Sequence, residues 1–236
     1  MEKVTFGGDK NLTGYLVGND GPGIIVLQEW WGITEEIKRQ ATKISEQGFR
    51  CLVPDLYKGS LGVDMEEAHH LMSNLDFPAA VGEIMEAAKF LNQDGSKGVG
   101  IGITGFCMGG ALTLLSLAEE SGTDITCGVP FYGVPEGLDC STISKPVQGH
   151  FGELDGMAGF SDAETAKTLR GELKKGNNES EVFIYPGVGH AFMNDDPQHP
   201  NIKAGVNVDT GFPGKSQDVQ NQAFKRMVDF FKAKLQ

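Results

Sequence analysis

Three short segments of the chain carry side chains that could act together in covalent catalysis. Cys107 lies between two glycines in residues 105–109, which read G-F-C-M-G. Asp155 ends the segment 152–155, and His190 follows a Pro-Gly-Val-Gly turn. A cysteine, a histidine and a carboxylate can act as nucleophile, base and orienting acid in acyl transfer. These residues therefore predict attack of a cysteine thiolate on a carbonyl carbon.

The surroundings of Cys107 distinguish it from the other cysteines. It follows an apolar run and precedes a helical segment, with Gly105 and Gly109 two positions away on either side. A strand that turns sharply into a helix needs such small neighbours, and it presents the central side chain above the sheet. The positive end of the helix dipole there favours a thiolate. The competing interpretation is a buried cysteine in a glycine-rich turn. Cys51 and Cys127 lie within apolar runs and are interpreted as small core residues.

His190 and Asp155 each follow a predicted strand. His190 comes after the strand at 181–185, and Asp155 comes after the strand at 147–151. The acid must hold one ring nitrogen of the histidine so that the other faces the thiol. We prefer Asp155 to Glu153, which lies only two residues past its strand; a solvated turn is the alternative for Asp155. The remaining histidines lie in a predicted surface helix, within a strand or in a polar loop, at His69, His70, His150 and His199.

Acyl transfer also needs N–H donors for the developing oxyanion. We expect one donor to be the backbone amide of Met108, directly after the nucleophile. The other is expected at Trp30, in the loop 28–32 that follows the apolar strand 24–27. Two adjacent tryptophans in a loop suggest that at least one faces the substrate, although both could pack in the core. The residues expected to line the pocket are Trp31, Tyr57, Phe106 and Phe192.

Strand-like and helix-like segments alternate along the 236 residues. This pattern predicts a single α/β domain, residues 1–236, whose mostly parallel sheet has helices on both faces. The order nucleophile, acid, histidine is the order of an α/β-hydrolase. Strands are predicted at 4–6, 12–17, 24–27, 50–53, 99–104, 126–131, 147–151 and 181–185, the first two as an antiparallel hairpin. Helices are predicted between Thr34 and Gly48, and at 64–75, 78–91, 108–121, 161–175 and 217–235, the last capped by Ser216.

Residues 194–215 are rich in Asp, Asn, Pro and Gly and show no clear periodicity. A loop this long inside a compact domain is usually a lid or a binding loop. Because it follows His190 directly, we expect it to border the active site as a candidate lid. Asp195, Asp196 and His199 could suggest a cation site, but we interpret them as a solvated loop.

The composition excludes several classes of function. The formal net charge of −12 argues against binding to nucleic acid or to an anionic membrane surface, because both require a basic footprint. No apolar run approaches the roughly 20 residues of a membrane span, and from residues 1–4 we expect no signal peptide. The four cysteines form no C-x-x-C pair, so no metal site is expected. We expect a cytoplasmic protein, where a catalytic thiol stays reduced.

One further motif, G-x-G-x-x-G at residues 100–105, matches a dinucleotide-binding pattern. In such a site the glycines form the turn after the strand. Here the first two glycines lie inside the apolar run, and the turn comes later, at Cys107. We therefore expect no nicotinamide and no other cofactor.

Taken together, these segments resemble the dienelactone hydrolase (carboxymethylenebutenolidase) family. The resemblance implies a single-domain α/β-hydrolase, a monomer, that opens lactones with a Cys-His-Asp triad. It also implies that Glu29 contacts the resting cysteine until substrate displaces it; a solvated Glu29 is the alternative. The matching blocks read Q-E-W-W-G at 28–32, P-D-L-Y at 54–57, G-F-C-M-G-G at 105–110, F-Y-G at 131–133, G-E-L-D at 152–155 and G-H-A-F at 189–192.

The chain departs from the best-known members of that family in one respect. Those members hold the substrate carboxylate with arginines, one after the base histidine and one in the helical region before the nucleophile. Residues 192–196 and 64–77 contain no arginine, and Asp195 and Asp196 would repel a carboxylate. This departure argues against an anionic dienelactone as the natural substrate, while the reaction type is unaffected.

The expected reaction is hydrolysis of an activated ester or lactone in two steps. Cys107 attacks the carbonyl while the N–H groups of Met108 and Trp30 bind the oxyanion, and His190 then activates water to break the thioester. Two alternatives remain from the sequence. One is a general carboxylesterase or thioesterase on the same scaffold. The other is a non-catalytic ligand-binding protein that has kept the fold.

Overall fold

A computed structural model describes residues 1–93, 100–119, 123–176, 179–194 and 216–236 of the chain. Eight strands form one sheet in the order β1-β2-β4-β3-β5-β6-β7-β8. The strands are β1 (Glu2–Phe6), β2 (Leu12–Val17), β3 (Gly23–Leu27), β4 (Arg50–Pro54), β5 (Ile101–Phe106), β6 (Ile125–Phe131), β7 (Gln148–Gly152) and β8 (Glu181–Tyr185). The helices are α1 (Glu35–Ser45), α2 (Met65–Ser73), α3 (Phe77–Gln93), α4 (Met108–Ala118), α5 (Ala163–Gly176) and α6 (Gln217–Leu235), with short 3-10 turns η1 (Gly8–Lys10) and η2 (Cys140–Thr142).

The pairing of the strands confirms the predicted α/β architecture. β1 and β2 form the expected antiparallel hairpin, and β2 pairs antiparallel with β4. The strands from β4 across to β8 are all parallel to one another. Parallel strands need helical crossovers that cover the sheet, and the strand–helix alternation had predicted them. None of the helices in the described ranges combines the length and the apolar character that crossing a bilayer requires.

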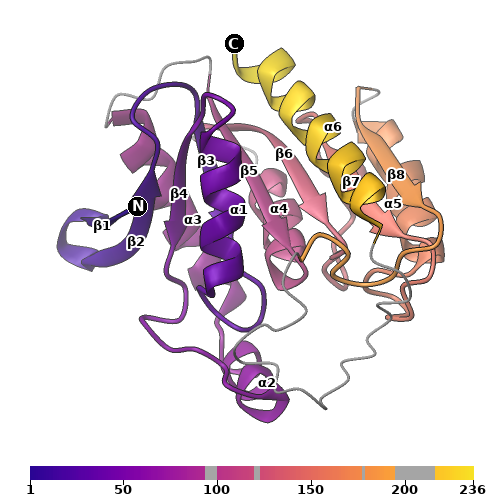
Figure 1. Ribbon diagram of the computed structural model, residues 1–236, viewed down its shortest axis with the longest axis horizontal. Coiled ribbons are helices and arrows are strands. Elements are labelled where there is room, and N and C mark those ends of the chain that lie inside the picture. Colours follow the sequence, from indigo (N-terminus) through magenta and orange to yellow (C-terminus); the bar gives the residue numbers. More distant parts are fainter. Residues whose placement is uncertain (94–99, 120–122, 177–178, 195–215) are drawn as a thin grey trace.

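The helices pack on both faces of the sheet, and each face has its own core. Figure 1 shows α1 and α6 in front of the sheet and α3, α4 and α5 behind it. Successive side chains of a strand point to opposite faces, so β3 contributes to both cores. Ile24 and Val26 pack in the cluster that contains α1 and α6 residues, whereas Ile25 and Leu27 pack in the cluster of α3, α4 and α5.

Some predicted boundaries differ from the observed ones. β5 continues through Phe106 rather than ending at residue 104, because Gly105 and Phe106 still pair with β6. The helix predicted at 108–121 ends at Ala118, where Glu119 adopts an extended backbone. The predicted N-caps Thr34 and Ser216 are confirmed, since each side chain accepts a backbone N–H of its helix. Of the candidate lid at 194–215, only Asn194 lies within the described residues.

Glycines allow β3, β5 and α4 to approach closely where the chain turns after β5. A Cβ at Gly105 would lie 2.2 Å from the carbonyl oxygen of Gly109. A Cβ at Gly109 would lie 2.6 Å from the carbonyl oxygen of Gln28. Both distances are too short for any side chain. The G-x-C-x-G pattern is therefore a packing requirement that brings the start of α4 against the end of β3.

We expect Gly105→Ala to lower the free energy of unfolding by about 1–3 kcal/mol or more, because the added methyl group overpacks a rigid backbone contact. The matched control is Gly171→Ala in α5, where a Cβ would meet nothing within 4 Å. That change should raise stability by about 0.5–1 kcal/mol, as alanine favours a helix interior. Urea unfolding of both variants measures the difference. Equal effects of the two substitutions would contradict the packing argument.

Candidate active site

The candidate site lies at the carboxyl ends of the parallel strands. Cys107 directly follows β5, Asp155 lies three residues after β7, and His190 lies five residues after β8. The carboxyl ends of parallel strands meet at one edge of the sheet, which is where open α/β sheets bind ligands. The topology thus brings together three residues that are far apart in the sequence.

The backbone at Cys107 forms a strained turn between β5 and α4. Its φ of 55° and ψ of −116° lie outside the regions that side chains usually allow. Its N–H donates to the carbonyl of Phe131 at 3.1 Å, and its carbonyl accepts from the N–H of Gly110 at 2.8 Å. A Cβ at Gly133 would lie 2.1 Å from that carbonyl oxygen, so this neighbour must be glycine. The arrangement has the features expected of a nucleophile that precedes a helix.

Strain is concentrated around the site. Three of the five non-glycine residues with positive φ in the described ranges are Cys107, Tyr132 (φ 35°) and Ala191 (φ 55°). Tyr132 follows β6 and packs edge-on against His190, with ring centroids 5.1 Å apart. Such conformations cost about 1–3 kcal/mol each and persist where the surroundings impose them. The sequence reasoning did not single out Tyr132 beyond its place in the F-Y-G block.

His190 is held between the other two predicted residues. Its Nδ1 lies 2.8 Å from Oδ2 of Asp155, and its side chain hydrogen-bonds with Cys107. The other carboxylate oxygen of Asp155 accepts the N–H of Met157 at 3.0 Å, which orients the acid. The hydroxyl of Ser161, a buried residue that the sequence reasoning missed, lies 3.1 Å from the same Nδ1. The structure therefore brings Cys107, His190 and Asp155 into one chain of contacts.

The charges around His190 favour the imidazolium. Burial by itself lowers the pKa of His190, but the negative charge of the Cys107 thiolate and the hydrogen bond to Asp155 outweigh burial and raise this pKa to about 10. A cation next to the sulfur stabilises a thiolate in turn.

The two expected oxyanion donors lie on neighbouring backbones. Met108 is the first residue of α4, where an N–H has no partner within the helix. Residues 29–32 form a tight turn in which the N–H of Gly32 donates to the carbonyl of Glu29 at 3.2 Å, and Trp30 lies within this turn. The close contact between Gly109 and Gln28 brings the two segments together. The roles of Met108 and Trp30 as oxyanion donors stay predictions.

Glu29, the first residue of this turn, is buried, so the interpretation of a solvated glutamate is wrong. Only 2% of its surface is exposed, and both carboxylate oxygens accept from Nδ2 of Asn194, at 3.3 and 3.2 Å. Burial raises the pKa of Glu29 to about 7, against the opposing effects of Asn194 and the charge of His190. The resemblance implied a contact with the resting cysteine, whereas here the hydrogen bonds of the carboxylate go to Asn194.

A buried polar network holds the loop that follows His190. Nε2 of Gln40, in α1, donates to the carbonyl of Met193 at 2.9 Å and to Glu36 at 2.8 Å. Nε2 of Gln220, in α6, donates to the carbonyl of Phe192 at 2.8 Å. The sequence reasoning missed these residues. In the sequence, Gln40 and Gln220 each stand out as a polar residue on the otherwise apolar face of a helix.

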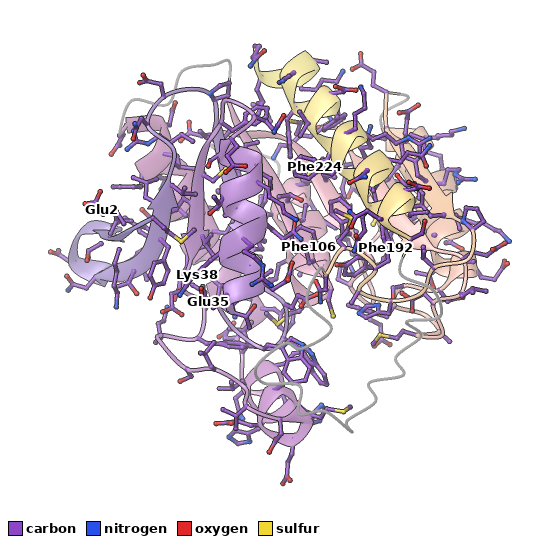
Figure 2. The ribbon with its side chains drawn as sticks, in the orientation of Figure 1. Glu2, Glu35, Lys38, Phe106, Phe192 and Phe224 are labelled. Carbon is purple, nitrogen blue, oxygen red and sulfur yellow. The ribbon has the colours of Figure 1, made fainter. Side chains whose placement is uncertain are left out.

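The predicted pocket residues are all nearly buried. Phe106 stacks on Phe131 with ring centroids 4.9 Å apart, and Phe192 packs 5.4 Å from Tyr132. Figure 2 shows Phe106 and Phe192 on the side of the sheet that α1 and α6 cover. Tyr57 directs its hydroxyl at the sulfur of Met108, 3.3 Å away. Trp30 is half-buried and Trp31 is buried, and the two rings meet edge to face. Whether these side chains contact substrate stays a prediction.

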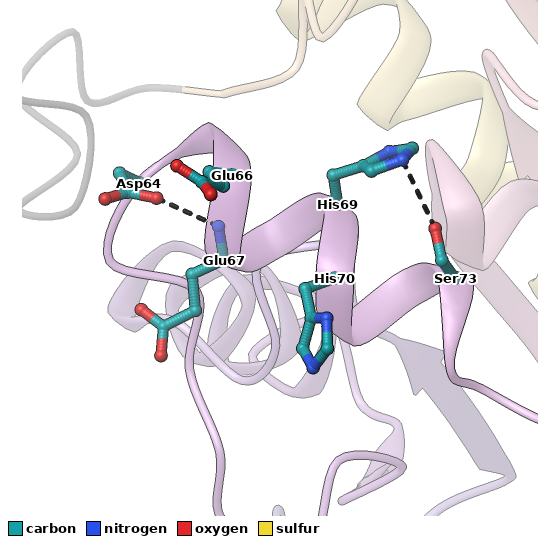
Figure 3. Close-up of a pocket in the computed structure, with 6 residues that line it drawn as sticks. All are labelled: Asp64, Glu66, Glu67, His69, His70 and Ser73. Atoms are coloured by element: carbon teal, nitrogen blue, oxygen red, sulfur yellow. Dashed lines mark hydrogen bonds between the residues drawn. The ribbon is translucent and has the colours of Figure 1, made fainter.

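The other described histidines occupy different places in the fold. His69 and His70 are exposed on α2, beside a shallow surface hollow (Figure 3). His150 is buried in β7, where burial lowers its pKa to about 3 and its Nδ1 lies 2.8 Å from the hydroxyl of Tyr185. Within the described ranges, no three His, Cys, Asp or Glu side chains are grouped so that they could hold a metal ion. Asp195, Asp196 and His199 lie outside those ranges.

Comparison with known proteins places these observations in a family. A family model described as "Dienelactone hydrolase family" matches residues 12–235. Protein usf of Aquifex pyrophilus is 30% identical over 190 residues, which cover 74% of this chain and 78% of that protein. Carboxymethylenebutenolidase 1 of Cupriavidus pinatubonensis is 27% identical over 188 residues, covering 74% and 76%. The crystal structure of a dienelactone hydrolase-like promiscuous phosphotriesterase from metagenomic libraries shares the fold, with a TM-score of 0.80, 20% identity and coverage of 100% and 98%.

We expect Cys107→Ser to lower the pKa of His190 by about 1–3 units, because burial then acts without the thiolate charge. NMR titration of the imidazole measures this pKa directly. The control is Cys140→Ser, which changes a buried cysteine in η2. An unchanged pKa in Cys107→Ser would show that the sulfur carries no charge beside the histidine.

The burial of Glu29 predicts a pH-dependent cost in stability. Between about pH 4.5 and 7 the unfolded chain releases this proton while the folded chain keeps it, so the free energy of unfolding falls as pH rises through that window. Glu29→Gln should therefore gain about 2–3 kcal/mol relative to wild type between pH 4.5 and pH 8. Denaturant unfolding at both pH values tests this, with the exposed Glu66→Gln as control. A pH-independent difference between wild type and Glu29→Gln would refute the prediction.

Proposed function

The chain belongs to the dienelactone hydrolase family, and from that premise we propose that it hydrolyses uncharged, activated esters and lactones through Cys107, His190 and Asp155. One observation carries the proposal. Asp155 and Cys107 both hydrogen-bond with the same buried histidine, and the sulfur lies in a strained turn at the start of a helix. This arrangement supports an activated thiolate next to a proton donor. A ligand-binding protein would have no need of it.

In the first step the Cys107 thiolate attacks the carbonyl carbon. A C–S bond forms, and the carbonyl electron pair moves to the oxygen, where the N–H groups of Met108 and Trp30 receive the charge. The tetrahedral intermediate collapses, the C–O bond breaks, and His190 donates its proton to the leaving oxygen. An enol or phenol leaving group needs little protonation, so a thiolate can expel it. In a lactone the leaving oxygen stays attached to the acyl group.

In the second step water hydrolyses the thioester. His190, now neutral, accepts a proton as the water attacks, and Asp155 stabilises the imidazolium that forms. The second tetrahedral intermediate expels the thiolate and leaves a carboxylic acid. The thiolate and the imidazolium are thereby restored. Ser161 supports this cycle by lying against the same ring nitrogen that contacts Asp155.

The charges around the site favour an uncharged substrate. Glu29 and Glu36 are buried beside it, and Arg39 is already paired with Glu36. The described part of the loop after His190 contains no arginine, and Asn194 in it is an uncharged amide. A negatively charged substrate would meet acidic groups without a matching cation in the described loop after His190.

Exposed apolar side chains lie in the turn after β7 and in the segment that contacts Trp31. Leu154 and Met157 flank Asp155 in the turn after β7, and the N–H of Leu154 donates to the loop before His190. Leu61 and Val63 are exposed beside Gly62, whose N–H donates to the carbonyl of Trp31. These exposed apolar side chains favour a substrate with apolar groups on its acyl or alcohol part.

Steady-state hydrolysis of matched substrates tests the function. We expect uncharged enol lactones and p-nitrophenyl esters to have kcat/KM values at least tenfold above those of the anionic cis- and trans-dienelactones. Cys107→Ala should lose about 10³-fold or more in kcat, as removal of a nucleophile usually does. Intact-mass spectrometry of wild type should detect the acyl-enzyme on Cys107. Equal activity of wild type and Cys107→Ala would reject the thiolate mechanism, and a preference for the anionic lactones would reject the substrate class.

A further inference from the structure

The imidazole of His190 is held on its Nδ1 side from both ends of one loop. Asp155, at the start of this loop, places Oδ2 2.8 Å from Nδ1. Ser161, at the end of the loop, places its hydroxyl oxygen 3.1 Å from the same nitrogen. Ser161 is fully buried, and only 5% of Asp155 and 6% of His190 are exposed. Both contacts with Nδ1 are therefore shielded from bulk water.

Hydrogen bonds within the loop fix the positions of its two ends. Met157 donates its N–H to Oδ1 of Asp155 at 3.0 Å, and the carbonyl of Met157 accepts the N–H of Ser161, also at 3.0 Å. The carbonyl of Phe160 accepts the N–H of Val134 at 2.9 Å, which ties the loop to the segment after β6. A hydroxyl on a loop that is already ordered loses little conformational entropy when it bonds to the ring.

The chemistry of the two oxygens decides which partner donates at Nδ1. A carboxylate can only accept, so Nδ1 must carry the hydrogen that contacts Asp155. Ser161 meets the same N–H, and its oxygen is therefore a second acceptor in a shared, three-centre hydrogen bond. The His190 side chain also hydrogen-bonds with Cys107, and Nε2 is the ring nitrogen left for that contact.

We propose that Ser161 is a positioning residue that keeps the ring of His190 aligned while the thioester is hydrolysed. This inference rests on the proposed function, in which Cys107 forms the thioester. The sulfur of a thioester carries neither a proton nor a charge, so the hydrogen bond between Cys107 and the ring is lost at that stage. The hydrogen bonds to Asp155 and Ser161 remain, and Nε2 is then free to accept a proton from water. Ser161 acts through His190 and does not touch the reacting atoms.

The aromatic rings around His190 restrain it less specifically than these hydrogen bonds do. Tyr132 packs edge-on with ring centroids 5.1 Å apart, and Phe160 lies tilted at 6.3 Å. An imidazole has nearly the same shape after its ring is turned by 180°, so such packing does not distinguish the two orientations. The two acceptors at Nδ1 do distinguish them, because they direct one nitrogen at oxygen atoms and leave the other for the reaction. Ser161 strengthens this selection by adding a second acceptor.

The separate rates of acylation and deacylation test this role. Wild type and Ser161→Ala are mixed rapidly with p-nitrophenyl acetate; release of p-nitrophenol reports acylation, and intact-mass spectrometry of quenched samples follows the loss of the acyl group from Cys107. We expect Ser161→Ala to deacylate about tenfold more slowly, a size that the loss of one buried hydrogen bond can explain. Its acylation rate should stay within about twofold of wild type, so the acyl-enzyme should accumulate.

The pH profile of deacylation separates loss of the hydrogen bond from general damage to the loop. An acceptor at Nδ1 stabilises the imidazolium, so its removal should lower the pKa of His190 in the acyl-enzyme by about 0.5–1 unit. Deacylation needs the neutral ring, and the rise of its rate with pH should therefore move to lower pH in Ser161→Ala. The matched control is Ser116→Ala in α4, since Ser116 is fully buried and its hydroxyl has no hydrogen-bond partner among the described residues. That variant should match wild type in both rates and in the pH profile.

A wild-type rate of deacylation in Ser161→Ala would overturn the proposal. Equal slowing of acylation and deacylation, or a pH profile that does not move, would overturn it as well, because the hydroxyl would then not act on the ring during thioester hydrolysis. Failure of the proposed function has a different signature, since wild type itself would then form no acyl-enzyme on Cys107. If wild type forms the acyl-enzyme and Ser161→Ala deacylates normally, the nucleophile stands and only the role of Ser161 falls.

Discussion

The site depends on one constraint, the left-handed backbone turn between β5 and α4 at Cys107. A non-glycine residue keeps this strained conformation only where closely packed surroundings impose it. Gly105, Gly109 and Gly133 make that approach possible, since a Cβ at each would lie between 2.1 and 2.6 Å from a carbonyl oxygen. The turn places the sulfur at the start of a helix and brings the loop after β3 against it. The predicted nucleophile and its expected oxyanion donors therefore arise from a single packing arrangement.

The second organising feature is that each buried carboxylate near the site has its own hydrogen-bond partner. Asp155, Glu29 and Glu36 are all nearly buried, and each has a specific partner that faces it: His190, Asn194 and the Arg39–Gln40 pair respectively. Buried carboxylates without partners would destabilise the fold or take up protons. The partners are thus needed for stability, and they also decide which acid interacts with the histidine. Folding and chemistry constrain the same few side chains.

The strands, the order of the motifs and the strand ends at which Cys107, Asp155 and His190 lie could be predicted from the sequence, because these depend on local patterns. Cys107, Asp155 and His190 could be identified from the strand that precedes each. Ser161, Asn194 and Gln220 could not, because their roles come from contacts between segments that only the tertiary structure brings together. The extension of β5 to Phe106 was missed for the same reason, since its pairing with β6 is not visible in the local pattern. The contact of Glu29 with Asn194 likewise required the fold.

Gln40 in α1 and Gln220 in α6 both hold the loop that follows His190. This arrangement affects the point during synthesis at which the site can form. Gln40 lies early in the chain, whereas Gln220 belongs to the last helix. Domains are synthesised from the amino terminus, so β5 and its cysteine leave the ribosome well before α6 does. A nascent chain therefore contains Cys107 before Gln220 is available to hold the loop after His190. Because α6 follows every other described element, the surroundings of the proposed nucleophile are complete only after α6 has been translated.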